Sequence, residues 1–173
     1  IIREKSLFIF DLDGVIYRAN DPIPSAITAI QRLQQLGKRI VFFTNNSSQT
    51  PSAYQAKLEK MGISVLSSTI FTSALISARY LAKRFPQGSI FYIGEQGLAE
   101  ALKDQGIHVI NQEHPDIIFQ DHLSSNIHVD AVIVGWDREV SYAKFRMAFM
   151  CILAGAEFYA TNNDPTYPAP GTL

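Results

Sequence analysis

The chain has 173 residues, of which 47% are hydrophobic and 18% are charged, and its 15 basic and 16 acidic residues give a formal net charge of −1. This length allows one ordinary domain or two small ones, since domains of ~100–200 residues are typical. The basic residues form no cluster that would mark a nucleic-acid-binding surface, and no apolar segment reaches the ~18 residues of a membrane span. With one cysteine and no signal-peptide pattern, the sequence predicts a cytoplasmic protein without an internal disulfide.

The first half of the chain alternates strand and helix patterns. An apolar run that starts at Ser6 predicts a buried strand. The following elements are expected to be a helix over 22–37, a strand over 39–44, a helix over 50–62 and a helix over 72–85. Gly37 and Gly62 stand at the ends of two of these helices, and Thr50-Pro51 is a suitable start for another.

The second half repeats the alternation. It predicts strands over 89–94, 108–110, 130–135 and 157–161, helices over 95–105 and 141–154, and a less regular segment over 116–126. Strands separated by helices of this length favour an α/β fold with mostly parallel strand pairing. Pro86 and Gly88 interrupt the pattern, so we expect a domain boundary there, with one domain over 1–85 and another over 86–173.

Two carboxylates, Asp11 and Asp13, follow the first apolar run, and Gly14 comes next. Carboxylates at the end of a buried strand are costly unless they carry out chemistry or bind a cation. In an open parallel sheet this position lies at the carboxyl edge, where α/β proteins bind ligands. One ionised carboxylate near a divalent cation can act as a nucleophile, while a second in a different environment can hold a proton for a leaving group. The alternative is a pair of loop carboxylates that cap the following segment.

The second strand ends in Thr44-Asn45-Asn46-Ser47, and we expect this strand to neighbour the first. A hydroxyl, side-chain amides and backbone N–H groups in a tight turn are donors that can hold phosphate oxygens. Alone, such a string is more often an ordinary turn. Beside the two aspartates it predicts a phosphate-binding site.

These segments resemble motifs of the haloacid dehalogenase (HAD) superfamily. Residues 11–15 (DLDGV) are similar to its first motif and residues 44–47 (TNNS) to its second. The branch in question contains para-nitrophenyl-phosphatase-like, phosphoglycolate-phosphatase-like and pyridoxal-phosphate-phosphatase-like enzymes, which insert a large α/β cap after the second motif. Segments 93–98, 134–138 and 160–164 look like parts of that cap. The resemblance implies an α/β fold: a Rossmann-like HAD core over 1–85 and an inserted α/β cap domain over 86–173.

The resemblance also implies roles for individual residues. Asp11 would be the nucleophile that takes the phosphoryl group as an aspartyl-phosphate. Asp13 would protonate the leaving oxygen and then deprotonate the hydrolytic water. The Asp11 carboxylate and the Asp13 backbone carbonyl would hold Mg²⁺, and Thr44 with the N–H groups of Asn45 and Asn46 would hold the phosphate.

Substrate and partners follow from the same resemblance. The substrate would be a small phosphorylated metabolite, and the family allows a homodimer formed through the cap. The cap loop after Asp164 reaches over the substrate in the family, so Tyr167 is either a specificity contact or a packed loop aromatic.

The sequence also departs from the family. Family members supply a lysine and a further acidic motif later in the chain, and nothing after Asp164 matches them. Since the chain starts at Ile1 and stops in a loop-like segment at Leu173, we expect a fragment that lacks the remaining core strands. Mg²⁺ typically takes one or two carboxylates, and phosphoryl transfer depends strongly on charges around the phosphate. We therefore expect weak or absent phosphatase activity in this chain.

Two other functions remain open from the sequence. One is a non-catalytic module that binds a phosphorylated ligand or partner, and the other is a metal-dependent glycosyltransferase that uses the D-x-D pair. The remaining polar residues favour structural roles: the histidines at 108, 114, 122 and 128 fit no tight metal site, and Asp137-Arg138 favours a structural ion pair. Cys151 is expected in the core of its helix.

Overall fold

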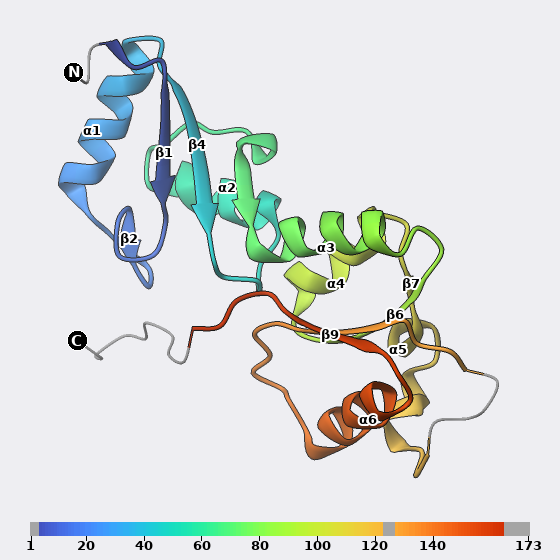
Figure 1. Cartoon of the computed structure of the whole chain (residues 1–173). Helices are drawn as coiled ribbons and strands as arrows, with labels where there is room; N and C mark the ends of the chain where they lie inside the picture. The colour runs from blue at the N-terminus through green and yellow to red at the C-terminus, as the bar shows by residue number, and fades with distance from the viewer. Residues whose placement is uncertain (1–3, 123–126, 165–173) are drawn as a thin grey trace. The chain divides into compact units, whose positions relative to one another are not determined.

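The computed structural model describes residues 4–122 and 127–164. Contacts within the chain divide it into two compact units (Figure 1). Among the described residues, the first unit contains 4–45, 51–72 and Asp164, and the second contains 46–50 and 73–163. The helix over 73–84 groups with the second unit, whereas the domain boundary near Pro86 stays a prediction.

The first unit is a small parallel sheet with two helices. Its elements are β1 (Leu7–Asp11), β2 (Tyr17–Arg18), β3 (Asp21–Pro22), α1 (Pro24–Gln35), β4 (Arg39–Thr44), α2 (Pro51–Lys60), a 3-10 helix (Ser67–Thr69) and β5 (Ile70–Thr72). The sheet has the order β1-β4-β5, and both pairings are parallel. Strands β2 and β3 form a separate antiparallel hairpin beyond the end of β1 (Figure 1).

One face of this sheet packs against the helices. Phe42 of β4 lies in a core cluster with Ile30 of α1 and Leu58 of α2. Adjacent residues on a strand point to opposite faces, and Phe42 is 1% exposed whereas Phe43 is 42% exposed. The first strand, β1, was expected to be buried, and this expectation is wrong for the described residues, since its residues are only partly buried or exposed. Leu7 and Ile9 of β1 are exposed on the other face, where no described element of the first unit covers them.

The second unit has a four-stranded parallel sheet. Its elements are α3 (Ser73–Arg84), β6 (Ser89–Ile93), α4 (Gln96–Asp104), β7 (His108–Val109), α5 (Ile110–Glu113), a 3-10 helix (Pro115–Phe119), β8 (Ala131–Val134), α6 (Tyr142–Leu153) and β9 (Glu157–Ala160). The strand order is β7-β6-β8-β9, and every pairing is parallel. Helices α3 and α4 pack with Ile90 and Ile133 on one face, while α6 packs with Phe91 and Val132 on the other.

The α/β fold with parallel sheets is confirmed, and one short strand ends earlier than expected. Ile110 was expected in the strand over 108–110, but it begins α5. The side chain of the next residue, Asn111, accepts a hydrogen bond from the Tyr92 N–H (3.1 Å) and donates one to the Tyr92 carbonyl (2.9 Å). This side chain occupies the backbone groups of β6 that a longer β7 would need. No described helix has both the length and the hydropathy required to cross a membrane.

Candidate functional site

The carboxyl edge of the first unit's sheet gathers the predicted polar residues. Strands β1 and β4 are parallel neighbours, as expected, and Asp11 lies opposite Phe43 in their register. Thr44 is the last residue of β4, so the loop after β1 and the turn after β4 leave the sheet side by side. This is the edge at which open parallel sheets bind ligands.

Asp11 is exposed at the end of β1. Its Oδ1 accepts a 2.8 Å hydrogen bond from the Leu12 N–H, which orients the carboxylate. The Leu12 side chain is fully buried in the core and anchors the chain immediately after Asp11. An accessible, oriented carboxylate of this kind can bind a cation or attack an electrophile.

Asp13 occupies a more buried position than Asp11. Burial raises the pKa of its carboxyl group, and the nearby Asp11 charge raises that pKa further, while the Lys57 charge and a hydrogen bond with the Thr44 side chain oppose the rise. Within the described part of the chain, Asp13 Oδ2 is buried and has no hydrogen-bond partner. A buried acceptor left in this way is costly unless a ligand or a proton satisfies it.

The backbone around Gly14 turns sharply after Asp13. Gly14 has a φ of +79°, a region that glycine adopts without steric cost. Its N–H donates a 2.7 Å hydrogen bond to the Tyr17 carbonyl, and Asp13 forms a β-bridge with Tyr17. The fully buried Tyr17 side chain thus lies at the base of the loop that carries Asp13.

Lys57 of α2 is a site residue that the sequence analysis missed. Its Nζ donates a 2.7 Å hydrogen bond to the Ala19 carbonyl and lies 3.5 Å from the centre of the Tyr17 ring. Burial lowers the pKa of Lys57, and the Asp13 carboxylate opposes this shift. No sequence pattern links a single lysine to an acid so far ahead of it in the chain, so this residue could be found only from the fold.

Side-chain hydrogen bonds stabilise the turn after β4. Asn46 Oδ1 accepts hydrogen bonds from the Ser48 N–H (2.9 Å) and the Ser48 hydroxyl (2.7 Å). The Asn45 side-chain amide donates to the Asp164 carboxylate. The phosphate-binding roles of Thr44, Asn45 and Asn46 stay predictions, and Tyr167 lies outside the described residues.

The donors at this edge fit a hard divalent cation. Mg²⁺ takes oxygen ligands and is usually bound by one or two carboxylates with water and phosphate completing its shell. The exposed Asp11 carboxylate is an oxygen donor of this kind, and the backbone carbonyl of Asp13 is a second, while the buried Asp13 Oδ2 is left for a proton. No three His, Cys, Asp or Glu side chains of the described residues come together to hold a metal ion, at this edge or elsewhere, so a cation here would depend on few protein ligands.

The second unit has its own polar cluster at the ends of β6 and β8. Arg138 donates to both oxygens of Glu95 at 2.7 Å, which holds the pKa of that carboxyl below its usual value. Lys144 Nζ lies 2.8 Å from the nearly buried Asp137 carboxylate. The Asp137-Arg138 segment thus forms ion pairs, as the sequence favoured, and they line a pocket with a volume of ≈ 430 Å³.

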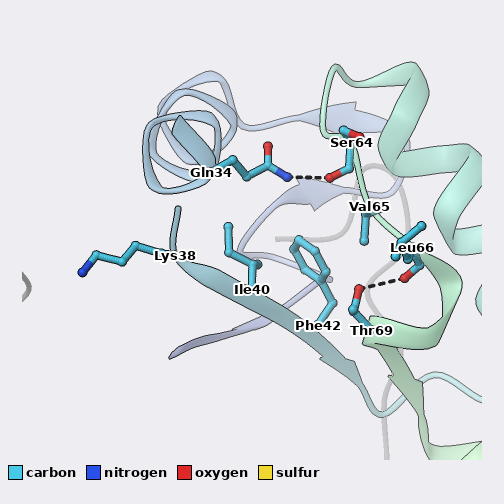
Figure 2. Close-up of a pocket in the computed structure, with 8 residues that line it drawn as sticks. All are labelled: Gln34, Lys38, Ile40, Phe42, Ser64, Val65, Leu66 and Thr69. Carbon is cyan, nitrogen blue, oxygen red and sulfur yellow. Dashed lines mark hydrogen bonds between the residues drawn. The ribbon is translucent and has the colours of Figure 1, made fainter. Parts of the chain in front are cut away.

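A smaller pocket, of ≈ 190 Å³, belongs to the first unit (Figure 2). Among its lining residues are Gln34, Lys38, Ile40, Phe42 and Thr69, and Figure 2 shows the Gln34 amide donating to the Ser64 carbonyl across one side. Ile40 and Phe42 precede Thr44 on β4, so this pocket lies away from the carboxyl edge. The described residues that line it include no carboxylate.

The two aspartates stand at the edge where open α/β sheets bind ligands, and comparison with known proteins defines the family. Residues 8–108 match the family model of the haloacid dehalogenase-like hydrolases. The chain belongs to this family. The expected likeness to the HAD superfamily and its para-nitrophenyl-phosphatase-like branch is thereby confirmed.

Individual relatives agree with this assignment. An acid sugar phosphatase from Staphylococcus epidermidis is 34% identical over 167 residues, covering 96% of this chain and 59% of the relative. A p-nitrophenyl phosphatase from Archaeoglobus fulgidus has a TM-score of 0.81 at 28% identity, covering 96% of this chain and 58% of that one. A double mutant of a thermostable NPPase from Geobacillus stearothermophilus has a TM-score of 0.81 at 34% identity, covering 97% and 60%. The chain therefore spans about three fifths of the length of these relatives.

Proposed function

We propose that this chain carries the nucleophile and the acid–base residue of a Mg²⁺-dependent phosphomonoester phosphatase. The observation that carries the proposal is the contrast between two carboxylates at one sheet edge. Asp11 is exposed and oriented by the Leu12 N–H, while burial raises the pKa of Asp13. Two acids whose environments differ in this way are suited to the separate roles of nucleophile and proton donor.

In this proposal, the Asp11 carboxylate attacks phosphorus and the bond to the leaving oxygen breaks, giving an aspartyl-phosphate. Asp13 donates its proton to that oxygen and afterwards takes one from the water that hydrolyses the acyl phosphate. The raised pKa of Asp13 favours the protonated form that the first step needs. Thr44 and the N–H groups of Asn45 and Asn46 hold the phosphoryl oxygens.

Mg²⁺ belongs to the proposal because the oxygen donors of the site suit it. The Asp11 carboxylate and the Asp13 backbone carbonyl would hold the ion, which would offset the negative charge of the phosphate and of the attacking carboxylate. Within the chain, the Leu12 N–H orients the Asp11 carboxylate, and the hydrogen bond with the Thr44 side chain orients the Asp13 carboxyl group.

The substrate is proposed to be a small phosphorylated metabolite. Relatives named as an acid sugar phosphatase and as a p-nitrophenyl phosphatase make a sugar phosphate and p-nitrophenyl phosphate the first compounds to test. Tyr167 stays a predicted specificity contact, and a cytoplasmic location stays a prediction from the sequence.

The proposal is tested by following p-nitrophenyl phosphate hydrolysis with and without Mg²⁺ in the unaltered chain and in Asp11→Asn. We expect Asp11→Asn and Mg²⁺ removal each to abolish turnover, whose starting level in this chain is low. The matched control is Asp104→Asn, at the exposed end of α4, which should leave turnover unchanged. Turnover that survives Asp11→Asn contradicts the assigned nucleophile. If there is no turnover, but calorimetry shows phosphate-ester binding that is indifferent to Mg²⁺, a non-catalytic phospholigand-binding module replaces this proposal.

We also propose a homodimer through the second unit, with α6 as the contact. Four large apolar side chains of this helix are more than half exposed and recur at intervals of three and four residues: Tyr142, Phe145, Phe149 and Leu153. Such a spacing places them in one stripe. The flanking cations Lys144 and Arg146 already pair with Asp137 and Asp121, so an apolar partner surface suits the stripe.

A further inference from the structure

Lys57 connects α2 to the loop that carries Asp13. Its Nζ makes a hydrogen bond to the Ala19 carbonyl and sits over the Tyr17 ring. Both partners belong to the segment that leaves Asp13, forms the β2–β3 hairpin and enters α1. One helix side chain thus holds this segment by two separate contacts.

The cation over Tyr17 is placed where its attraction to the ring is strong. The Tyr17 side chain is fully buried and Lys57 is half-buried, so water screens the contact only in part. Partial removal from water strengthens the attraction between an ammonium group and an aromatic ring. The contact therefore fixes the Tyr17 ring as well as the lysine.

Ala19 adds a second reason for the hairpin to need support. Its φ of +53° lies in the left-handed region, which is unfavourable for a residue with a side chain. Such conformations persist only where the surrounding structure holds them. The hydrogen bond from Lys57 is aimed at the carbonyl of this residue.

The position of the hairpin affects Asp13 through backbone contacts. Tyr17 forms the β-bridge with Asp13, and its carbonyl accepts the hydrogen bond from the Gly14 N–H. A displacement of Tyr17 would therefore move the peptide units on either side of the Asp13 side chain. The charge of Lys57 also acts on the Asp13 carboxylate and opposes the rise of its pKa.

We propose that Lys57 is a positioning residue of the Asp11–Asp13 site, which fixes the β2–β3 hairpin against α2 and thereby sets where the Asp13 carboxylate stands. The catalytic consequence of this role rests on the proposed phosphatase function, whereas the positioning itself can be measured without turnover.

Amide hydrogen exchange measured by NMR on the 173-residue chain tests the positioning. In Lys57→Met we expect exchange at Gly14, Ile16 and Ile23 to accelerate about tenfold, which corresponds to about 1.4 kcal/mol. Amides of β6 and β8 should be unaffected. Lys57→Arg keeps the charge and the donor, so it should stay within about threefold of the unaltered chain.

Lys60→Met is the matched control, because Lys60 is an exposed lysine on the same helix. It should leave every loop amide unchanged. Unchanged exchange at Gly14, Ile16 and Ile23 in Lys57→Met overturns the proposal. An acceleration spread over the whole chain also overturns it, because it would show a general loss of stability.

A measurement on the unaltered chain tests the contact between Lys57 and Tyr17 even if Lys57→Met does not fold. The Lys57 ε-methylene protons should show nuclear Overhauser contacts to the Tyr17 ring and an upfield ring-current shift. The absence of both overturns the proposal.

Measurements of turnover in Lys57 and Asp11 variants distinguish a failure of the positioning role from a failure of the proposed phosphatase function. With p-nitrophenyl phosphate, Lys57→Met should lower kcat about ten- to hundredfold with little change in KM, and Lys57→Arg should restore it. An unchanged kcat in Lys57→Met overturns the role of Lys57, provided that Asp11→Asn abolishes turnover. If Asp11→Asn does not abolish it, the phosphatase assignment fails, and the exchange data alone decide the role of Lys57.

Discussion

The environment of Asp13 is unfavourable for its charged form and suits the proton-donor role proposed for this residue. Its carboxylate is half-buried, its Oδ2 lacks a hydrogen-bond partner among the described residues, and the neighbouring Asp11 adds a like charge. An acid placed for structure alone would have its acceptors satisfied. The position of Asp13 is thus costly in the folded chain and useful for a group that must hold a proton.

This cost gives a pH-dependent prediction for Asp13→Asn. The folded-state pKa of Asp13 is raised above its ordinary value of 3.8, so the folded chain holds this proton more tightly than the unfolded chain does. Its contribution to stability is therefore lost as the pH rises from 3.8 through the raised pKa. Removing the charge should raise the free energy of unfolding at pH 7 by on the order of 1 kcal/mol, as measured by urea denaturation.

The gain from Asp13→Asn should shrink at pH 3.5, where the carboxyl group of the unaltered chain is protonated. Asp21→Asn, on the exposed strand β3, serves as the control and should change stability little at either pH. A loss of stability at pH 7 in Asp13→Asn would show that burial is not the dominant influence on this carboxyl group.

Elements with a clear apolar period were predictable, and the short ones were not. The strand over 39–44 and the helix over 141–154 appear within a residue or two as β4 and α6, because each has a long run of regular spacing. The two-residue strands β2 and β3 have no period to recognise, and β5 is only three residues long. Asp11, Asp13 and Thr44 could be placed together because parallel neighbours share a carboxyl edge. Lys57 contacts the β2–β3 hairpin that follows Asp13, and no sequence pattern predicts this hairpin.

The Glu95–Arg138 pair links the loops after β6 and β8 and predicts acid sensitivity of the second unit. The Arg138 hydrogen bonds lower the pKa of Glu95 below its ordinary 4.5, so the stabilisation is present above pH 4.5 and is lost as the pH falls through the lowered pKa. Arg138 is 69% exposed, which limits the contribution to about 1 kcal/mol. Glu95→Gln should therefore lower stability at pH 7 and flatten its dependence on pH below 4.5.

Thermal denaturation from pH 3 to 7, followed by the fluorescence of the single tryptophan, Trp136, measures this effect close to the pair. Glu100→Gln is the control, because the Glu100 carboxylate contacts Gln96 on the same helix. An unaltered pH profile in Glu95→Gln would contradict the role of the pair.

The apolar stripe of α6 predicts the oligomeric state of the chain. Phe149→Glu places a charge in the middle of the stripe, and a charge buried at an interface without a partner is strongly unfavourable. Light scattering after size-exclusion chromatography should show a dimer for the unaltered chain and a monomer for Phe149→Glu. Lys103→Glu, in the last turn of α4 and outside the stripe, should remain a dimer. A monomer in the unaltered chain would contradict the proposed contact.

At the scale of the whole molecule, the two units have separate cores and differ in how their sheets are covered. The second unit has a sheet covered on both faces, with buried residues such as Cys151, where burial raises the thiol pKa to about 11. The first unit has a sheet covered on one face within the described residues, and it carries Asp11, Asp13, Thr44 and Lys57. The residues of the proposed phosphatase site therefore lie in the unit with the smaller core.

Paramagnetic broadening by Mn²⁺, a substitute for Mg²⁺ with the same preference for oxygen ligands, tests the central claim that this sheet edge binds a metal. In NMR spectra of the 173-residue chain, Mn²⁺ should broaden the amide signals of residues 11–14 and 44–46 first, and excess Mg²⁺ should restore them. Asp11→Asn should abolish this selective broadening. Broadening that persists in Asp11→Asn, or that begins at the carboxylates of the second unit, would contradict the account.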